Sequence, residues 1–173
     1  ITNPSKLENG TSDSRSGLLT YPQNITNGYI QGIYPSYKVK SGDKFRSIVN
    51  CESGATSCYV VFRLDYSVSG SSSVQTFWAF VERYEGLYYS ADIDLTPLAG
   101  QDLKFILTVL STGSPVGDRA LWVAPIIYNG GSSVPAPTLT LTPVPPSATS
   151  TITNTPIAPT ETPTITNTPI APT

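Results

Sequence analysis

Short runs in which apolar and polar residues alternate dominate the first 130 positions of the chain. The clearest run is 87–95, where the odd positions are apolar and the even positions from Tyr88 to Asp94 are mostly polar. A period of two predicts a β-strand with one buried face and one solvated face. We therefore expect Tyr88, Asp92 and Asp94 to share the solvated face of this strand.

Further short runs of the same kind are separated by segments rich in Gly, Ser and Pro. These segments are typical of turns between antiparallel strands. Helix should be minimal, because no window of eleven residues has a convincing 3.6-residue period. The sequence thus predicts an all-β, antiparallel sandwich with further strands at 29–37, 44–49, 59–68, 74–83, 103–110 and 120–127.

Composition divides the chain into three parts. Residues 1–17 are rich in Asn, Ser, Gly and Thr, and we expect a linker or an arm without its own core. Residues 18–131 hold most of the aromatic residues and form the predicted sandwich domain. Residues 132–173 contain 10 of the 16 prolines and no aromatic residue, so they predict an extended Pro/Thr-rich tail.

The tail carries an internal repeat, because the nine residues 152–160 recur at 165–173. Thr beside Pro is the compositional mark of O-glycosylated stalks, whereas a bare flexible linker is the alternative. We expect O-glycosylation of the repeat hydroxyls. The candidate acceptors are Thr151, Thr153, Thr155, Thr160, Thr162, Thr164, Thr166 and Thr168.

Two cysteines, Cys51 and Cys58, flank a loop that contains Gly and Ser. Their spacing fits a disulfide that clamps a hairpin, and two reduced thiols are the alternative. A zinc site is nearly excluded, since the chain has no His and no further Cys. A disulfide favours an oxidising compartment, so we expect an extracellular or cell-surface location.

The charges are few and scattered, with 10 basic and 12 acidic residues and a net charge of −2. No basic stripe is present to neutralise a phosphate backbone, so a nucleic acid is not an expected partner. No run approaches the 18 apolar residues of a membrane-spanning helix. The chain begins at Ile1 and stops inside a repeat, so we expect it to belong to a longer polypeptide.

Catalytic residues have little support in the sequence. The chain has no His to act as a base and no Gly-x-Ser-x-Gly elbow around a nucleophile. Asp92 and Asp94 could serve as a carboxylate pair for glycoside hydrolysis, but two acids on an exposed strand face are more often solvated charges. We expect a protein that is not an enzyme and has no catalytic cofactor.

Three segments carry a family resemblance. Residues 92–101 (DIDLTPLAGQ), the apolar run 103–109, and residues 117–126 (GDRALWVAPI) follow one another. Together they resemble the second half of galactose-binding-like jelly rolls, specifically the NPCBM-type carbohydrate-binding modules. The resemblance implies an antiparallel jelly-roll fold with the Pro/Thr-rich tail appended. It also implies a structural calcium ion at the sandwich edge, to which Asp118 could supply a carboxylate.

Exposed aromatic residues would decide a sugar-binding function, because sugars stack their C–H faces on aromatic rings. We expect Trp122 in the core, since it lies mid-strand between small residues. The candidate carbohydrate-binding residues are Tyr88, Trp78, Tyr84, Asp92 and Asp94.

Two functions remain open from the sequence. The first is a non-catalytic structural subunit of a cell-surface or filamentous assembly, whose partners are other copies of the chain or a longer parent chain. The second is a carbohydrate-binding module tethered on a Pro/Thr stalk, whose partners are glycans. The 13-residue repeat of the tail favours the structural subunit.

Overall fold

The computed structural model describes residues 1–130. The tail, with its predicted repeat, extended form and O-glycosylation sites, lies outside the described residues. Within 1–130, no helix has the length and hydropathy that a membrane span would require. The described residues form an all-β fold whose single helical turn is a 3-10 turn, η1 (Thr96–Leu98).

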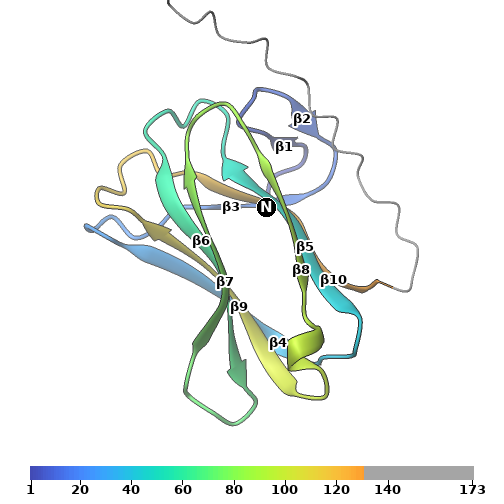
Figure 1. Ribbon diagram of the computed structural model, residues 1–173. Helices are drawn as coiled ribbons and strands as arrows, with labels where there is room; N and C mark the ends of the chain where they lie inside the picture. Colours follow the sequence, from blue (N-terminus) through green and yellow to red (C-terminus); the bar gives the residue numbers. More distant parts are fainter. Residues whose placement is uncertain (131–173) are drawn as a thin grey trace, which may run out of the picture. The chain divides into compact units, whose positions relative to one another are not determined.

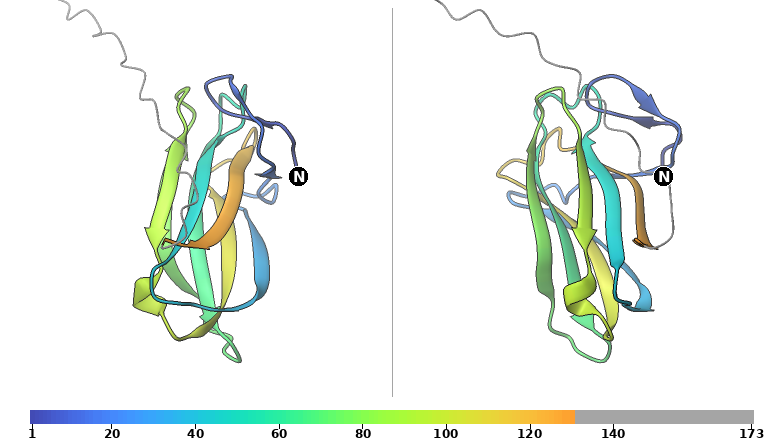
Figure 2. Two further views of the ribbon diagram at one scale, coloured as in Figure 1. Left: turned by 90° about the vertical axis from the view of Figure 1, so that its right-hand side faces the viewer. Right: turned by 45° about the vertical axis from the view of Figure 1, so that its right-hand side comes forward.

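Two four-stranded antiparallel sheets pack face to face (Figures 1 and 2). Apart from the β6–β7 hairpin, the paired strands of both sheets are distant in sequence, so both sheets depend on long-range contacts. The first sheet has the order β3 (Gly17–Thr20), β10 (Ala120–Asn129), β5 (Asp43–Cys51), β8 (Tyr89–Asp94). The second sheet has the order β4 (Tyr29–Lys38), β9 (Asp102–Ser111), β6 (Tyr59–Val68), β7 (Gln75–Arg83).

The prediction of an antiparallel sandwich is confirmed, and the order of the strands is compatible with a jelly roll. The six further predicted strands and 87–95 correspond to β4–β10, with ends that differ by at most two residues. The alternation predicted for 87–95 holds from Ala91 to Leu95, where Ala91 and Leu95 are buried and Asp92 and Asp94 are exposed. At the start of the run it was wrong, because Leu87 is 47% exposed and Tyr88 packs against the apolar cluster around Leu7.

Aromatic rings fill the space between the sheets. Trp122 of β10 is 1% exposed, as expected for a core residue. Its indole meets the rings of Phe62 and Phe45 edge-on, with centroids 4.8 and 6.1 Å away. Edge-to-face pairs of this kind add about 0.5–1.5 kcal/mol each to the energy of burial. Trp122 thus ties β10 to β5 in its own sheet and to β6 in the other.

The N-terminal segment 1–17 packs on the sandwich and belongs to the same compact unit. It contains the small two-stranded sheet of β1 (Ser5–Lys6) and β2 (Ser12–Asp13). Leu7 is buried against the outer face of the first sheet, where it joins Ile48, Leu121 and Val123 in a second apolar cluster. We call residues 1–16 the N-terminal arm.

Cys51 and Cys58 form a disulfide, so the predicted pairing is confirmed. The expectation that it clamps a hairpin was wrong. Cys51 ends β5 in the first sheet, and Cys58 precedes β6 in the second sheet, and these two strands do not pair. The loop 52–57 therefore crosses from one sheet to the other, and the disulfide closes that crossing.

Candidate functional site

An open groove of about 420 Å³ runs between the edge strands β7 and β8. These strands lie at the same side of the sandwich but in different sheets, so no hydrogen bonds join them. The groove is lined by Val49, Trp78, Phe80, Tyr89, Ser90, Ala91, Asp92 and Ile93. We call it the aromatic groove.

Two aromatic rings of β7 lie side by side in the aromatic groove. Trp78 and Phe80 are two residues apart and oppose Leu64 and Phe62 of β6, so both face the space between the sheets. Their rings are within 3° of parallel, with centroids 6.0 Å apart. Both side chains are only partly buried, because β7 has no neighbouring strand beyond it. The result is a pair of parallel, partly exposed aromatic rings.

Tyr89 faces these rings from β8. Its ring centroid lies 4.9 Å from that of Phe80, at a tilt of 50°. The Tyr89 hydroxyl donates a hydrogen bond to the Glu85 carboxylate. This hydrogen bond, with burial second, raises the pKa of Tyr89 to about 12, so the phenol stays protonated at all physiological pH values. Tyr89 thus contributes an apolar wall with one polar, neutral group.

Asp92 lies at the rim of the groove within a group of hydrogen-bonded side chains on the outer face of the first sheet. It accepts from the Arg46 guanidinium at 2.9 Å, and Lys44 Nζ lies 3.5 Å away. The Tyr128 hydroxyl also donates a hydrogen bond to Asp92 at 3.1 Å, and the Arg46 guanidinium lies over the Tyr128 ring. Burial acts to raise the pKa of Asp92, but the bonds from Arg46 and Tyr128 outweigh it, so the pKa is lowered.

The other sugar-binding candidates lie away from the aromatic groove. The Tyr84 hydroxyl is 3.3 Å from the Gly54 amide and 3.4 Å from the Glu8 carbonyl, which places it near the N-terminal arm. Tyr88 packs against the apolar cluster around Leu7. The side chain of Thr96 and then its backbone amide, which donates to Asp94 Oδ1 at 2.9 Å, lower the pKa of Asp94. The structure therefore brings together only Trp78 and Asp92 of the five.

Asp118 was the candidate calcium ligand. Its Oδ1 accepts a hydrogen bond from the Tyr59 amide at 2.9 Å, which holds the 117–118 turn against β6. Its Oδ2 is buried without a hydrogen-bond partner. Within residues 1–130, however, no cluster of three acidic, Cys or His side chains includes Asp118. Calcium takes six to eight oxygen ligands, which include backbone carbonyls, so Asp118 could supply one of them and the calcium site stays a prediction.

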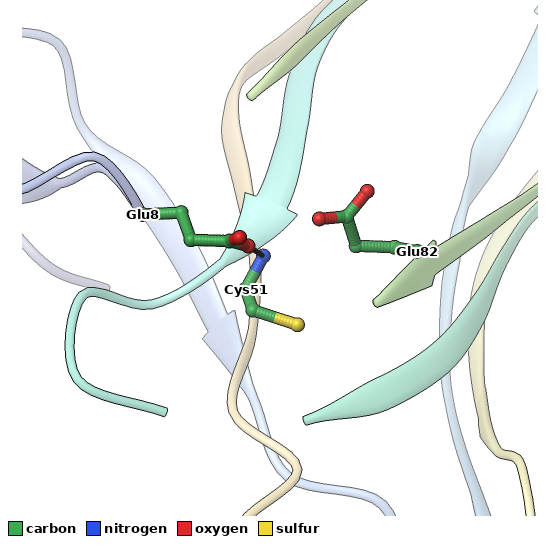
Figure 3. Close-up of side chains that lie close together, drawn as sticks. All are labelled: Glu8, Cys51 and Glu82. Carbon is green, nitrogen blue, oxygen red and sulfur yellow. Dashed lines mark hydrogen bonds between the residues drawn. The ribbon is translucent and has the colours of Figure 1, made fainter. Parts of the chain in front are cut away.

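Glu8, Cys51 and Glu82 form one cluster of possible ligand atoms in the described part, all within 4.8 Å of one another (Figure 3). Cys51 is in the disulfide, so its sulfur is not free to bind a metal ion. The Glu8 carboxylate accepts backbone hydrogen bonds from Cys51, Glu85, Gly86 and Leu87. Four N–H dipoles that converge on one carboxylate repel a cation, so this cluster does not fit a metal site.

Sequence reasoning missed three of these residues, although signals for them were present. Phe80 and Glu82 follow Trp78 at intervals of two, so the alternation puts all three on the inward face of one strand. Glu82 is an acidic residue at a position where the alternation predicts an apolar one. Tyr89 also occupied an apolar position of 87–95, but its proximity to β7 depends on the order of the strands and could not be read from the sequence.

A second cavity, of about 340 Å³, opens at the opposite side of the sandwich. There β4 and β10 each carry an irregularity in the strand pairing, at 33–36 and at 123–126. Each irregularity contains a proline, Pro35 or Pro125. The core residues Phe45, Leu64, Phe105 and Leu107 form part of the lining. We call this the proline gap.

No protein-family model matches this chain. A comparison with curated proteins likewise finds no significant similarity. Functional conclusions therefore depend on the residues and geometry described above.

Proposed function

We propose that this chain is a non-catalytic extracellular module that binds carbohydrate in the aromatic groove. The observation that carries the proposal is the pair of parallel, partly exposed rings of Trp78 and Phe80 on an open strand edge. Pyranose rings have apolar C–H faces that stack on flat aromatic surfaces. Two parallel rings about 6 Å apart offer such a surface to one sugar or to two adjacent sugars.

Polar groups around the rings can take the sugar hydroxyls. The Tyr89 hydroxyl lies at one wall, and Ser90 and Asp92 lie at the rim. β8 is an edge strand, so its outer backbone N–H and C=O groups have no strand partner within residues 1–130. A largely apolar groove with a few polar groups at its border is the usual composition of a sugar-binding surface.

The charges of the groove favour binding over hydrolysis. A glycosidase needs one carboxylic acid with a raised pKa to protonate the leaving oxygen. The pKa values of Asp92 and Asp94 are both lowered, and Asp92 is held by Arg46. These two acids are therefore unsuited to act as the proton donor.

We also infer a jelly-roll topology and secretion. If the eight strands β3–β10 are counted 1–8, the sheets read 1-8-3-6 and 2-7-4-5, which is the order of two interleaved Greek keys. The disulfide is consistent with an oxidising, extracellular compartment. Both inferences agree with a sugar-binding module of the family that the sequence resembles.

Binding of neutral polysaccharides by the full chain tests this proposal. Affinity electrophoresis in gels that contain soluble glucans, mannans, xylans or galactans should show retardation by at least one polymer. Trp78→Ala should abolish the retardation, whereas Tyr21→Ala, which removes an exposed aromatic ring outside the groove, should leave it unchanged. Equal retardation of both folded variants would contradict the proposal.

A second function, assembly into a polymer, has support from the proline gap. β3 pairs with β10 only as far as Val123, so the outer edge of β10 from Pro125 to Tyr128 has no strand partner within residues 1–130. β4 is the facing edge strand, and Ile33 and Tyr34 are exposed on it. An extended segment of another copy could add as a strand here and cover the apolar gap.

Truncation after Gly131 tests the assembly function. If an extended segment from the tail of one copy fills the proline gap of the next, the full chain should assemble and the truncated chain should be monomeric. Sedimentation velocity over a range of concentrations measures both states. A truncated chain that still polymerises, or a full chain that stays monomeric at high concentration, would contradict the assembly function and leave the sugar-binding function unaffected.

A further inference from the structure

Two carboxylates are buried together at one end of the sandwich. Glu82 of β7 is 1% exposed, and Glu8 of the N-terminal arm is 2% exposed. They approach each other from opposite sides, with the Cys51 backbone beside them (Figure 3). Two ionised carboxylates this close in a buried site would repel each other strongly, so they cannot both be charged without a large cost.

The two side chains differ in the hydrogen bonds that they receive. Its Oε1 accepts hydrogen bonds from the Glu85, Gly86 and Leu87 amides, and its Oε2 accepts one from the Cys51 amide at 3.1 Å. A carboxylate that receives several backbone N–H bonds is stabilised in its ionised form. Glu82, in contrast, has no hydrogen bond donated to either carboxylate oxygen.

Glu82 is correspondingly a neutral acid. Burial is the largest cause that raises the pKa of Glu82 to about 9, followed by the adjacent Glu8 carboxylate and the negative charge of Glu85. Tyr89 of β8 also faces this group, and its hydroxyl is bonded to Glu85. The disulfide beside it does not titrate. The groups that face Glu82 from the arm and from the 84–88 turn are thus acidic.

Glu8 is also the main polar link between the arm and the sandwich. Its backbone amide donates to Asn50 Oδ1 at 2.9 Å. Its carboxylate bonds to the 85–87 turn and to β5. Backbone hydrogen bonds from the Ser53 amide to the Lys6 carbonyl, at 3.3 Å, and from the Ala124 amide to the Ser16 carbonyl, at 2.9 Å, also hold the arm. Among these attachments, Glu8 is the one that uses a buried carboxylate.

We propose that Glu8 and Glu82 share one proton and form a pH-operated latch that holds the N-terminal arm on the sandwich. With the proton present, the Glu82 carboxyl donates to Glu8 and the latch is closed. When the proton leaves to bulk water, two buried carboxylates face each other, and the least costly relief is for Glu8 to move outward with the arm. The outer face of the first sheet at Ile48, Leu121 and Val123 then becomes exposed.

The direction of the stability change follows from the raised pKa. Between the ordinary glutamate pKa of 4.5 and the value of about 9, the folded chain holds a proton that the unfolded chain has released. Stability should therefore fall as the pH rises through this window, and the unfolding constant should increase by up to tenfold per pH unit. Below pH 4.5 this group should contribute no pH dependence.

Arm release can be measured by trypsin cleavage after Lys6 and Arg15. In the wild-type chain, cleavage should be at least tenfold faster at pH 10 than at pH 7, after correction for the rate on an unstructured peptide. Glu82→Gln keeps a neutral hydrogen-bond donor beside Glu8, so its cleavage should be equally slow at both pH values. The matched control Glu52→Gln removes an acid of the neighbouring loop and should behave as the wild type.

A measurement on the wild-type chain keeps the proposal testable if Glu82→Gln does not fold. The carboxyl carbon of Glu82, followed by NMR, should titrate with a midpoint near pH 9. A midpoint near pH 4.5, pH-independent cleavage of the arm, or an alkaline transition retained in a folded Glu82→Gln variant would each overturn the proposal. A melting temperature at pH 7 that rises with calcium and falls with a chelator would also overturn it, because a cation would then replace the shared proton.

Discussion

The indole rings of Trp78 and Trp122 lie 6.5 Å apart, one at the open groove and one in the core. Trp122 is 1% exposed and packs on Phe45 and Phe62, whereas Trp78 is only partly buried beside Phe80. These are the two tryptophans of the chain. The fluorescence of the protein therefore has one component from the candidate binding surface and one from the core.

We predict that acrylamide quenches the Trp78 component and leaves the Trp122 component nearly unaffected. Trp78→Phe keeps an aromatic ring in the groove and should leave a single, blue-shifted, poorly quenched emission. A polysaccharide that occupies the groove should protect the wild-type chain from quenching and should not alter the Trp78→Phe spectrum. Strong quenching of Trp78→Phe would show that Trp122 is accessible, contrary to the structure.

The disulfide yields a second prediction. It closes a short loop between two sheets that share no hydrogen bonds across β5 and β6, so it restricts the unfolded chain and joins the two layers. By the chain-entropy relation, a loop of this length contributes about 2–3 kcal/mol to the free energy of unfolding. Replacing both cysteines by serine should lower that free energy accordingly in urea titrations. Two reactive thiols in the denatured, unreduced chain would contradict the disulfide itself.

The strands could be predicted from the sequence because the alternation of side chains along them is local. Residues 59–68 and 103–110 carry their own period-two or continuous apolar pattern, and both are strands in the structure. The sheet to which each strand belongs is not local. The spacing of Cys51 and Cys58 fits a hairpin as well as a crossing between sheets, and only the complete strand order distinguishes them.

The candidate site was predictable only in part, for the same reason. Trp78 was recognisable as an aromatic residue on a strand, but its proximity to Tyr89 requires β7 and β8 to be edge strands at one side of the sandwich. Tyr88 was expected on the solvated face of 87–95, yet it packs beside Leu7 of the arm. The sequence of the polar segment 1–17 does not indicate that Leu7 packs on the outer face of the first sheet.

Trp122 yields a third prediction, on the stability of the core. It is among the largest fully buried side chains, and it contacts aromatic rings from three strands. Trp122→Ala should lower the free energy of unfolding by about 3–5 kcal/mol, since it leaves a large cavity between the sheets. Val116→Ala, at a position that is 71% exposed, should change it by less than about 0.5 kcal/mol. Denaturant titrations of both variants measure the difference, and similar values would contradict the assigned core.

Asp43 provides the last prediction, which concerns acid stability. It is 1% exposed at the start of β5, and its carboxylate accepts hydrogen bonds from three groups in the 37–43 turn and in β10. The Tyr37 hydroxyl and the Lys40 amide each lie 2.7 Å from Oδ2, and Asn129 Nδ2 lies 3.0 Å from Oδ1. Burial acts to raise the pKa of Asp43, but these hydrogen bonds outweigh it and lower the pKa below 3.8.

A carboxyl group whose pKa is lowered on folding stabilises the protein above its unfolded pKa, and this contribution is lost as the pH falls through the folded value. Asp43→Asn should therefore lower the free energy of unfolding by about 1–3 kcal/mol at pH 7, because its amide cannot accept all three hydrogen bonds. The difference from the wild type should shrink below pH 4, where the wild-type carboxylate becomes protonated. Asp102→Asn, at an exposed position of β9, serves as the control and should track the wild type throughout. Urea titrations at pH 7, 5 and 3 measure all three chains, and a difference between Asp43→Asn and the wild type that grows towards pH 3 would reverse the sign argued here.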